Sequence, residues 1–467
     1  MVGGHAANLP GLRERVGADH VVRGDGVRWL RAFLGEDVAR PVRHPLIESG
    51  FGSRSLGVSL GDGRGRTAAT LIPAVGCPLG CDFCSTSAMF GGKGRSVHFF
   101  DSAERLFDIM CALERALDAQ SFFVMDENFL LHRRRALRLL ELMRAHDKSW
   151  SLYVFSSANS LALYTPEELV ALGIAWLWIG LEGAASSYAK LARTDTRALV
   201  DRLQSHGIRV LGSSIIGLPE HAPDNVDAAI DHAVAHDTDF HQFMLYTPLP
   251  GTPLHAAHSA AGTLLSAGEC SEADAHGQLR FNFRHAHLTP GLETRLLRRA
   301  FERDFEVNGP SILRVARTLL RGFQRHKDHP EARVRARVRR ECRHLATTYA
   351  GALWAAEGFL RGQPQARARV RATRLALVRE FGLPARVAGP LVGSALRAAM
   401  HLEQRRRRRA VACEPPTFYE ANAAAVDALS LHARGAKPCR WVEATGDERA
   451  EAPLSGVRAP AVEPCRT

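Results

Sequence analysis

Between residues 67 and about 250, short apolar runs alternate with segments of helical periodicity. Each run is nearly continuous in Val, Ile, Leu, Phe or Tyr, as is typical of a strand buried on both faces of a parallel sheet. The runs are TAATLIPAV (67–75), SFFVMDE (121–127), WSLYVFSSA (150–158), AWLWIGLE (175–182), IRVLGSSIIG (208–217) and DFHQFMLYT (239–247). Six strand–helix units predict a parallel α/β structure. Since about eight units close a full barrel, we expect an open, partial TIM-type barrel.

The segments between these runs carry signals that begin and end helices. The stretch DSAERLFDIMCALERAL places Glu104 three residues after Asp101, which is the spacing of a capping box with Asp101 as the N-cap. In TPEELVALG, Thr165 is a candidate N-cap, Pro166 stands in the first turn and Gly173 follows the last turn. Both segments are therefore expected to form helices.

The remaining parts of the chain have other patterns. Residues 51–66 are interpreted as a linker, and residues 263–310 as a transitional extension of the α/β core. Residues 311–410 have helical periodicity and many arginines. Residues 411–467 contain scattered Pro, Ala and Gly with little periodicity, so we expect a disordered tail.

Positive charge is concentrated in one region. The whole chain has a formal net charge of +12, but residues 291–410 hold 28 Lys and Arg against 10 Asp and Glu, a net charge of +18, and the other residues sum to −6. Such a region can meet nucleic acid, anionic lipid or an acidic partner. The simpler interpretation is that these arginines lie on solvated helical faces.

No targeting or membrane segment is evident. The chain has no run of 18 uncharged apolar residues, and its N-terminus lacks the charged-then-apolar pattern of a secretory signal. Six of the nine cysteines are scattered, which does not resemble a disulfide framework. We expect a cytoplasmic protein with no transmembrane segment.

The other three cysteines stand together in GCPLGCDFCSTSAMFGGKGR (76–95), where Cys77, Cys81 and Cys84 form C-x3-C-x2-C. A structural zinc site needs four ligands, and a C-x2-C redox pair would leave Cys77 unused. Three thiolates on a 4Fe–4S cluster leave one iron open to an external ligand. The loop follows the first predicted strand directly, at the end where barrel folds place their chemistry.

In this strand context the motif resembles that of the radical SAM superfamily. The resemblance implies that residues 67–262 are a radical SAM core in which Cys77, Cys81 and Cys84 hold a 4Fe–4S cluster. It also implies that S-adenosylmethionine binds the open iron and is cleaved reductively to a 5′-deoxyadenosyl radical, which abstracts hydrogen from the substrate. The expected fold is α/β, a partial six-unit TIM-type barrel followed by a basic α-helical C-terminal region.

The resemblance places contacts to S-adenosylmethionine at the ends of later strands. The second strand ends in MDEN, where the family has a motif for the methionine amino group, and the sequence leaves open which carboxylate acts. The fifth strand is similar to a G-x-I-x-G motif, with Ser213 in place of its first glycine. The candidates are Asp126, Glu127 and Asn128 (second strand), the weaker Ser156 and Ser157 (third strand), Glu182 (fourth strand), and Phe83 and Gly217 beside the adenine.

The phrases CPLGCDFCS, DENF and YTPLPGTPL are most similar to the cobalamin-binding branch of the superfamily. In that branch a Rossmann-like domain with a D-x-H-x-x-G motif precedes the core. VGGHAANLP and GADHVVRGDG resemble the end of that domain, so residues 1–50 are interpreted as its remnant. The motif itself does not occur in the sequence, and His5 does not match it. We therefore expect cobalamin only if a longer reading frame exists.

The expected function is that of a radical SAM enzyme acting on an unactivated carbon of an unidentified metabolite, by methylation or rearrangement. A lipid or a secondary metabolite is the expected substrate class, and flavodoxin or ferredoxin the expected electron donor. No catalytic residue beyond the cofactor site is predicted.

Two alternatives stay open, an RNA-modifying radical SAM enzyme and a non-catalytic binding protein with a vestigial barrel. The RNA-modifying alternative is less favoured, because such enzymes resemble a pattern with extra N-terminal cluster cysteines, and here no cysteine precedes Cys77. The basic region also has few aromatic residues that could stack on bases. An auxiliary cluster on Cys413, Cys439 and Cys465 is not favoured, because no C-x2-C pair is among them.

Overall fold

The computed structural model describes residues 1–49, 54–55, 58–59, 68–182, 194–266, 268–270 and 279–408. The predicted tail, with Cys413, Cys439 and Cys465, lies outside the described residues, as does most of the predicted linker.

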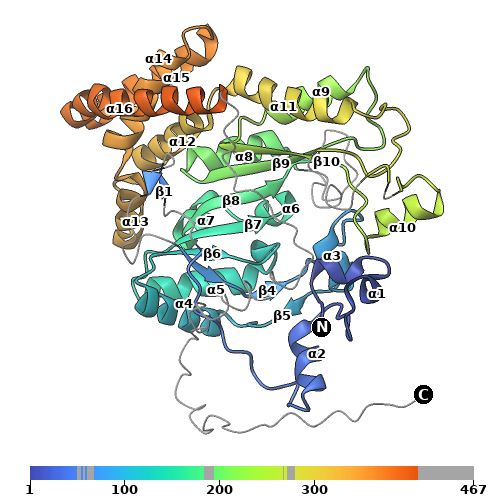
Figure 1. Cartoon of the computed structure of the whole chain (residues 1–467). Helices are drawn as coiled ribbons and strands as arrows, with labels where there is room; N and C mark the ends of the chain where they lie inside the picture. Colours follow the sequence, from blue (N-terminus) through green and yellow to red (C-terminus); the bar gives the residue numbers. More distant parts are fainter. Residues whose placement is uncertain are drawn as a thin grey trace, which may run out of the picture.

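Six parallel strands form the central sheet in the spatial order β10–β9–β8–β7–β6–β3 (Figure 1). The strands are β3 (Ala69–Leu71), β6 (Ser121–Val124), β7 (Ser151–Ser156), β8 (Ile174–Gly180), β9 (Arg209–Ile216) and β10 (Phe240–Leu245). Each strand lies beside the sheet strand that precedes it in sequence, which leaves β3 and β10 at the two edges. The predicted six-unit α/β core is confirmed.

The first predicted strand is divided in two. After β3 the chain passes Pro73 and forms β4 (Ala74–Val75), which pairs antiparallel with β5 (Val97–His98) outside the main sheet. The backbone N–H of Phe99 also donates to the Pro73 carbonyl at 2.9 Å. This small ladder fixes the two ends of the segment that contains the three clustered cysteines.

Helices connect the strands and cover the sheet. They are α4 (Ala103–Leu117), α5 (Arg133–Ala145), α7 (Pro166–Leu172), α8 (Thr196–Ser205), α9 (Val226–Val234) and α11 (Leu292–Asn308). The capping box at Thr165 is confirmed, with Glu168 as its reciprocal partner. The predicted N-cap at Asp101 is wrong. Ser102 caps α4, because its hydroxyl lies one residue nearer and accepts from the Arg105 N–H at 3.1 Å.

The hydrophobic core lies mainly on one face of the sheet, because buried residues alternate with half-buried ones along β7 and β8. Leu152, Ile174 and Val210 are at most 1% exposed, as expected for parallel strands with helices on their outer side. Each such side chain stabilises the fold by roughly 1.5–3 kcal/mol. The same core continues without interruption to Leu319 and Leu353, which belong to the C-terminal helices.

The C-terminal region is helical, as predicted. Its elements are α12 (Ser311–His326), α13 (Ala332–Cys342), the π-helix η5 (Leu345–Tyr349), α14 (Ala350–Phe359), α15 (Pro364–Phe381) and α16 (Leu383–Arg408). Arginines of α13 are buried against the core: Arg333 is 5% exposed and donates to the Ala171 carbonyl at 2.8 Å. The expectation that the arginines of this region lie only on solvated faces is therefore wrong for α13.

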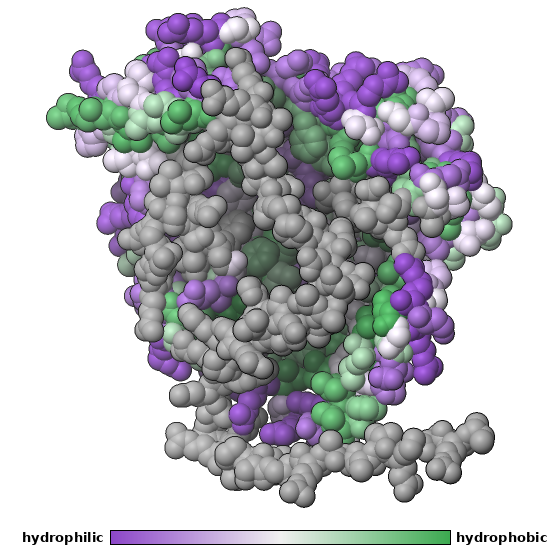
Figure 2. Space-filling model, in the orientation of Figure 1, coloured by the Kyte–Doolittle hydropathy of each residue, from purple (hydrophilic) through white to green (hydrophobic). Residues whose placement is uncertain are grey.

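The outer face of α16 is apolar. Leu383, Val387 and Leu391 are 71%, 47% and 70% exposed and lie one turn apart on one side of the helix. Figure 2 shows this hydrophobic stripe on the projecting part of α16, next to hydrophilic neighbours. The positive charge of the region is thus not spread evenly over its surface.

The N-terminal residues form short helices and an isolated bridge. They include η1 (His5–Asn8), α1 (Leu12–Val16) and α2 (Gly26–Phe33), which Asp25 caps. Val2 and Val21 form a parallel bridge. Within the described part of the chain, every helix is too short or too polar to traverse a bilayer.

Candidate active site

The cysteine-bearing segment is a tight loop at the carboxyl end of β4. It ends at α3 (Ser85–Met89), where Cys84 is the N-cap and its sulfur accepts from the Ser87 N–H at 3.4 Å. The Ser87 hydroxyl donates to the Cys77 carbonyl at 2.7 Å, which ties the first cysteine to the third. These hydrogen bonds within the protein hold the loop closed.

Gly80 shows why this loop requires glycine. Its φ is 68°, and a Cβ there would lie 2.7 Å from the Lys93 Cα and 2.9 Å from the Lys93 nitrogen. Backbone atoms cannot move aside as a flexible side chain can, so any larger residue would push the loop open. The Gly94 N–H donates to the Pro78 carbonyl at 2.8 Å and completes this close approach.

The three thiols are reduced, half-buried and electrostatically coupled. Burial raises the pKa of Cys77 to about 11, and Cys84, Cys81 and Glu127 add to the shift by charge repulsion. Three thiolates so close repel one another, and a cationic iron core would relieve the repulsion.

Among the described residues, no three His, Cys, Asp or Glu side chains lie close enough to hold a single metal ion. In a cubane cluster each thiolate binds a different iron, which is the arrangement that the resemblance implied for this loop.

At the end of β6 the structure separates the roles of two adjacent acids. Asp126 is 5% exposed, pairs with Arg135 at 3.0 Å and accepts from the Asn128 N–H at 3.0 Å. The carboxylate of Glu127 instead lies beside the backbone of Gly76, next to Cys77. Its Oε2 is buried and has no hydrogen-bond partner among the described residues. Burial raises the pKa of Glu127, and the charge of Asp126 raises it further.

Asn128 and the two serines of the third strand meet, as the resemblance implied, but they bind one another. The Asn128 Oδ1 accepts from the Ser156 hydroxyl at 3.1 Å and from the Ser157 N–H at 3.3 Å. Its Nδ2 donates to the Ser157 hydroxyl at 3.0 Å. This network links the carboxyl ends of β6 and β7, and so positions the neighbouring Glu127 by fixing the backbone after it.

Glu182 lies just beyond β8. It is 5% exposed and adopts a left-handed backbone with φ of 46°. Its N–H and that of Leu181 donate to the Ser213 carbonyl at 3.3 and 2.7 Å. The backbone is thus held by β9, which places Glu182 at the same end of the sheet as Glu127.

Gly217 is required for a contact within the protein. Its φ is 84°, and a Cβ there would lie 2.3 Å from the ring of Phe281. The resemblance assigned this position to the adenine, but the side on which a Cβ would project is occupied by Phe281. The Gly217 N–H donates to His221 Nδ1 at 3.0 Å.

A mostly apolar cavity of about 310 Å³ opens beside Gly217. Tyr246, Phe283, His258 and His285 contribute to its wall. The predicted Phe83 packs near it, with its ring centroid 6.3 Å from that of Tyr246. The sequence had suggested only a transitional extension for residues 263–310. The alternating FNFRHAH (281–287) was the one signal that pointed to an element with an apolar face.

Known proteins resemble the part of the chain that carries this site. Residues 71–233 match the model of the Radical SAM superfamily. An uncharacterised methyltransferase of Pyrococcus horikoshii is 26% identical over 53% of this chain and 56% of its own length. The bacteriochlorophyllide d C-12(1)-methyltransferase of Chlorobaculum tepidum is 28% identical over 39% of this chain and 41% of its own length. The chain therefore spans about half the length of these relatives.

Among solved structures, the chain resembles a radical S-adenosylmethionine methyltransferase of Kitasatospora setae with cobalamin and a [4Fe-4S] cluster bound. The TM-score is 0.46 and the identity 16%, over 74% of this chain and 82% of that one.

Proposed function

We propose that this chain is an enzyme that cleaves S-adenosylmethionine with a 4Fe–4S cluster held by Cys77, Cys81 and Cys84. Its residues 71–233 match the model of the radical SAM superfamily. One observation carries the proposal. The three thiols share a loop with Gly76, and beside Gly76 lies the carboxylate of Glu127, whose buried Oε2 has no hydrogen-bond partner among the described residues.

When bound, the reduced cluster would supply the electron that breaks the sulfonium bond, with flavodoxin or ferredoxin as the proposed donor. The protein residues bind and orient the cofactor. Glu127 would accept a hydrogen bond from the methionine ammonium, because its orphaned Oε2 lies in a buried place where a cation offsets the cost of desolvating a carboxylate.

Asp126 is not proposed for this role, because both of its oxygens already have partners in Arg135 and the Asn128 N–H. Asn128, Ser156 and Ser157 are proposed to position Glu127 rather than to touch the cofactor. Glu182 remains a proposed contact at the end of β8, while Phe83 and Gly217 would border the adenine.

Methyl transfer to a small molecule is the proposed reaction. Two relatives that match the core are named as methyltransferases.

The test is a reconstitution under anaerobic conditions with iron, sulfide, S-adenosylmethionine and a reductant. Glu127→Gln removes the charge but keeps an oxygen beside Gly76. It should bind the cofactor about ten- to a hundred-fold more weakly with normal iron content. The matched control is Glu220→Gln, an exposed carboxylate on the loop after β9. An unchanged affinity in Glu127→Gln would remove this residue from the site, and an unmodified protein that forms no 5′-deoxyadenosine would refute the function.

A further inference from the structure

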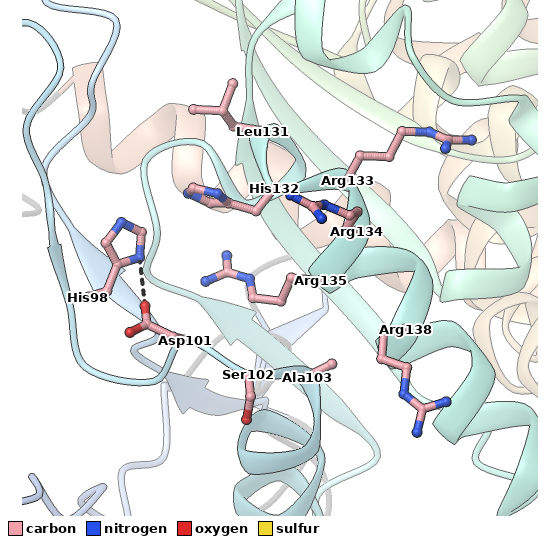
Figure 3. Close-up of a pocket in the computed structure, with 10 residues that line it drawn as sticks. All are labelled: His98, Asp101, Ser102, Ala103, Leu131, His132, Arg133, Arg134, Arg135 and Arg138. Carbon is pink, nitrogen blue, oxygen red and sulfur yellow. Dashed lines mark ion pairs between the residues drawn. The ribbon is translucent and has the colours of Figure 1, made fainter.

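A second cavity, of about 700 Å³, is lined mainly by basic side chains (Figure 3). It lies between His98 of β5 and the first turns of α4 and α5. The basic residues that line it are His98, His132, Arg133, Arg134, Arg135 and Arg138. Asp101 is its one acidic lining residue among those described, and the Asp101 side chain is 83% exposed. Acidic residues outside the lining offset part of this charge, since Arg133 pairs with Glu168 at 2.9 Å and Arg135 with Asp126 at 3.0 Å.

Two of these arginines keep unused hydrogen-bonding capacity. Arg135 is 8% exposed, and although one of its nitrogens pairs with Asp126, its buried Nε has no partner among the described residues. Arg134 is exposed at the rim and makes no hydrogen bond or ion pair with any described residue. In contrast, Arg138 pairs with Glu104 and Glu141 at the surface.

The helix ends add to the positive potential. The N-termini of α4 and α5, helices of 15 and 13 residues, both border the cavity, and a helix N-terminus carries partial positive charge. The first turn of α5 has no side-chain cap and no acidic residue, and instead contains three arginines in sequence.

Acidic residues are the ones that stabilise such a position, so the arginines repel the helix end and one another. The neighbouring positive charges also act on His132: burial lowers its pKa, and Arg135 and His98 lower that pKa further. A bound anion would offset this repulsion.

We propose that this cavity binds a phosphate or diphosphate group carried by a soluble small molecule. The guanidinium of Arg134, the buried and unpartnered Nε of Arg135 and the uncapped N-terminus of α5 together suit an anion with several acceptor oxygens better than a single carboxylate. A cavity of this volume has room for an organic part beside the phosphate. None of the exposed large apolar side chains of the described residues lines it, which disfavours a membrane surface.

This site differs from the one that holds the cluster, but it is connected to it. The ion pair between Arg135 and Asp126 joins the wall of the cavity to the residue before Glu127. Since β5 also closes the cysteine loop through β4, an anion here lies against the same elements that support the cofactor. The inference does not depend on the proposed reaction, because it concerns binding to the protein without cluster.

The experiment is a calorimetric titration of the full-length protein, without cluster or S-adenosylmethionine, with pyrophosphate and with inorganic phosphate at fixed ionic strength. We expect saturable binding of one pyrophosphate and weaker binding of phosphate. Arg134→Ala should weaken pyrophosphate binding about tenfold, because one charge-assisted contact is lost. Arg134→Glu should abolish it. Because Arg134 is exposed, neither variant should lower the melting temperature.

The matched control is Arg115→Ala, which removes an exposed arginine at the opposite end of α4. It should bind pyrophosphate as the unmodified protein does. Equal losses in Arg134→Ala and Arg115→Ala would mean that binding reflects overall charge only, and would overturn the proposal. Absence of saturable binding to the unmodified protein would overturn it as well.

Discussion

Glu341 of α13 is predicted to be a major determinant of stability, because it joins the C-terminal helices to the amino-terminal ends of the strands. It accepts from Arg209 at 2.7 Å and from the Ser151 hydroxyl at 2.7 Å, and these are the first residues of β9 and β7. Arg337 lies 3.5 Å away on the same helix. Although burial alone would raise the pKa of Glu341, Arg209 and Arg337 lower it. The carboxylate is therefore charged and shared by two guanidinium groups.

The expected loss in the free energy of unfolding follows from the burial of these charged groups. Arg209 and Arg337 are 6% and 5% exposed, and the Glu341 side chain is 15% exposed. The pKa of Arg337 is lowered, first by burial, which shows that Glu341 compensates it only in part. Removing one partner from a buried ion pair costs about 3–5 kcal/mol, since the remaining charge stays desolvated. Glu341→Ala should lower the free energy of unfolding by that amount, and Glu341→Gln by roughly 1.5–3 kcal/mol, because it keeps the hydrogen bonds.

The assay is urea unfolding followed by far-ultraviolet circular dichroism. The control is Glu302→Ala, which breaks a 2.8 Å pair with Arg298 on an exposed face of α11 and should leave stability nearly unchanged. The double variant Arg209→Met/Glu341→Leu should lose less than the sum of its single variants, since no unpaired charge from this pair remains. If Glu341→Ala were as stable as Glu302→Ala, the assignment of this cluster as a buried electrostatic joint would be wrong.

Three further predictions concern the cluster, acid and RNA. Cys81→Ala should lose most of its iron after anaerobic reconstitution, measured by colorimetric iron analysis, whereas Cys111→Ala on α4 should keep it; full retention in Cys81→Ala would contradict the cluster assignment. Burial lowers the pKa of His241 to about 3 from an ordinary 6.5, so the unfolded chain binds the extra proton. Stability should therefore fall as the pH decreases below about 6.5, and His241→Asn should flatten that slope in thermal melts. The protein should show no saturable, salt-sensitive binding to single-stranded RNA in fluorescence anisotropy, because arginines of α13 are engaged with the barrel; tight binding would restore the RNA-modifying alternative.

Part of the candidate site followed from the sequence. The spacing of Cys77, Cys81 and Cys84 after a strand predicted three thiols on one loop, because residues so near in sequence are near in space whatever the fold. The same holds for MDEN at the end of β6. The cap of α4 was missed by one residue, since Asp101 and Ser102 are both good N-caps and only the backbone decides which hydroxyl or carboxylate reaches the Arg105 N–H.

The roles within MDEN could not be predicted. Asp126 and Glu127 are chemically alike and adjacent, and their difference arises from distant partners. Arg135 reaches back from α5 to Asp126, while the backbone of Gly76, on the cysteine loop, lies beside Glu127. Gly217 was assigned to a base on the pattern alone, whereas the ring that requires its missing side chain belongs to Phe281.

The sequence by itself determined the order of strands and helices and the grouping of three cysteines on one loop, because periodicity, caps and short spacings are local properties. Only the tertiary structure decided which acid is left unpaired, where the arginines of α13 go, and that six basic side chains line one cavity with two helix ends. In each case the deciding contact joins residues on different elements. Burial there removes water as the default partner, so the free energy of a charge depends on whichever group the fold brings to it.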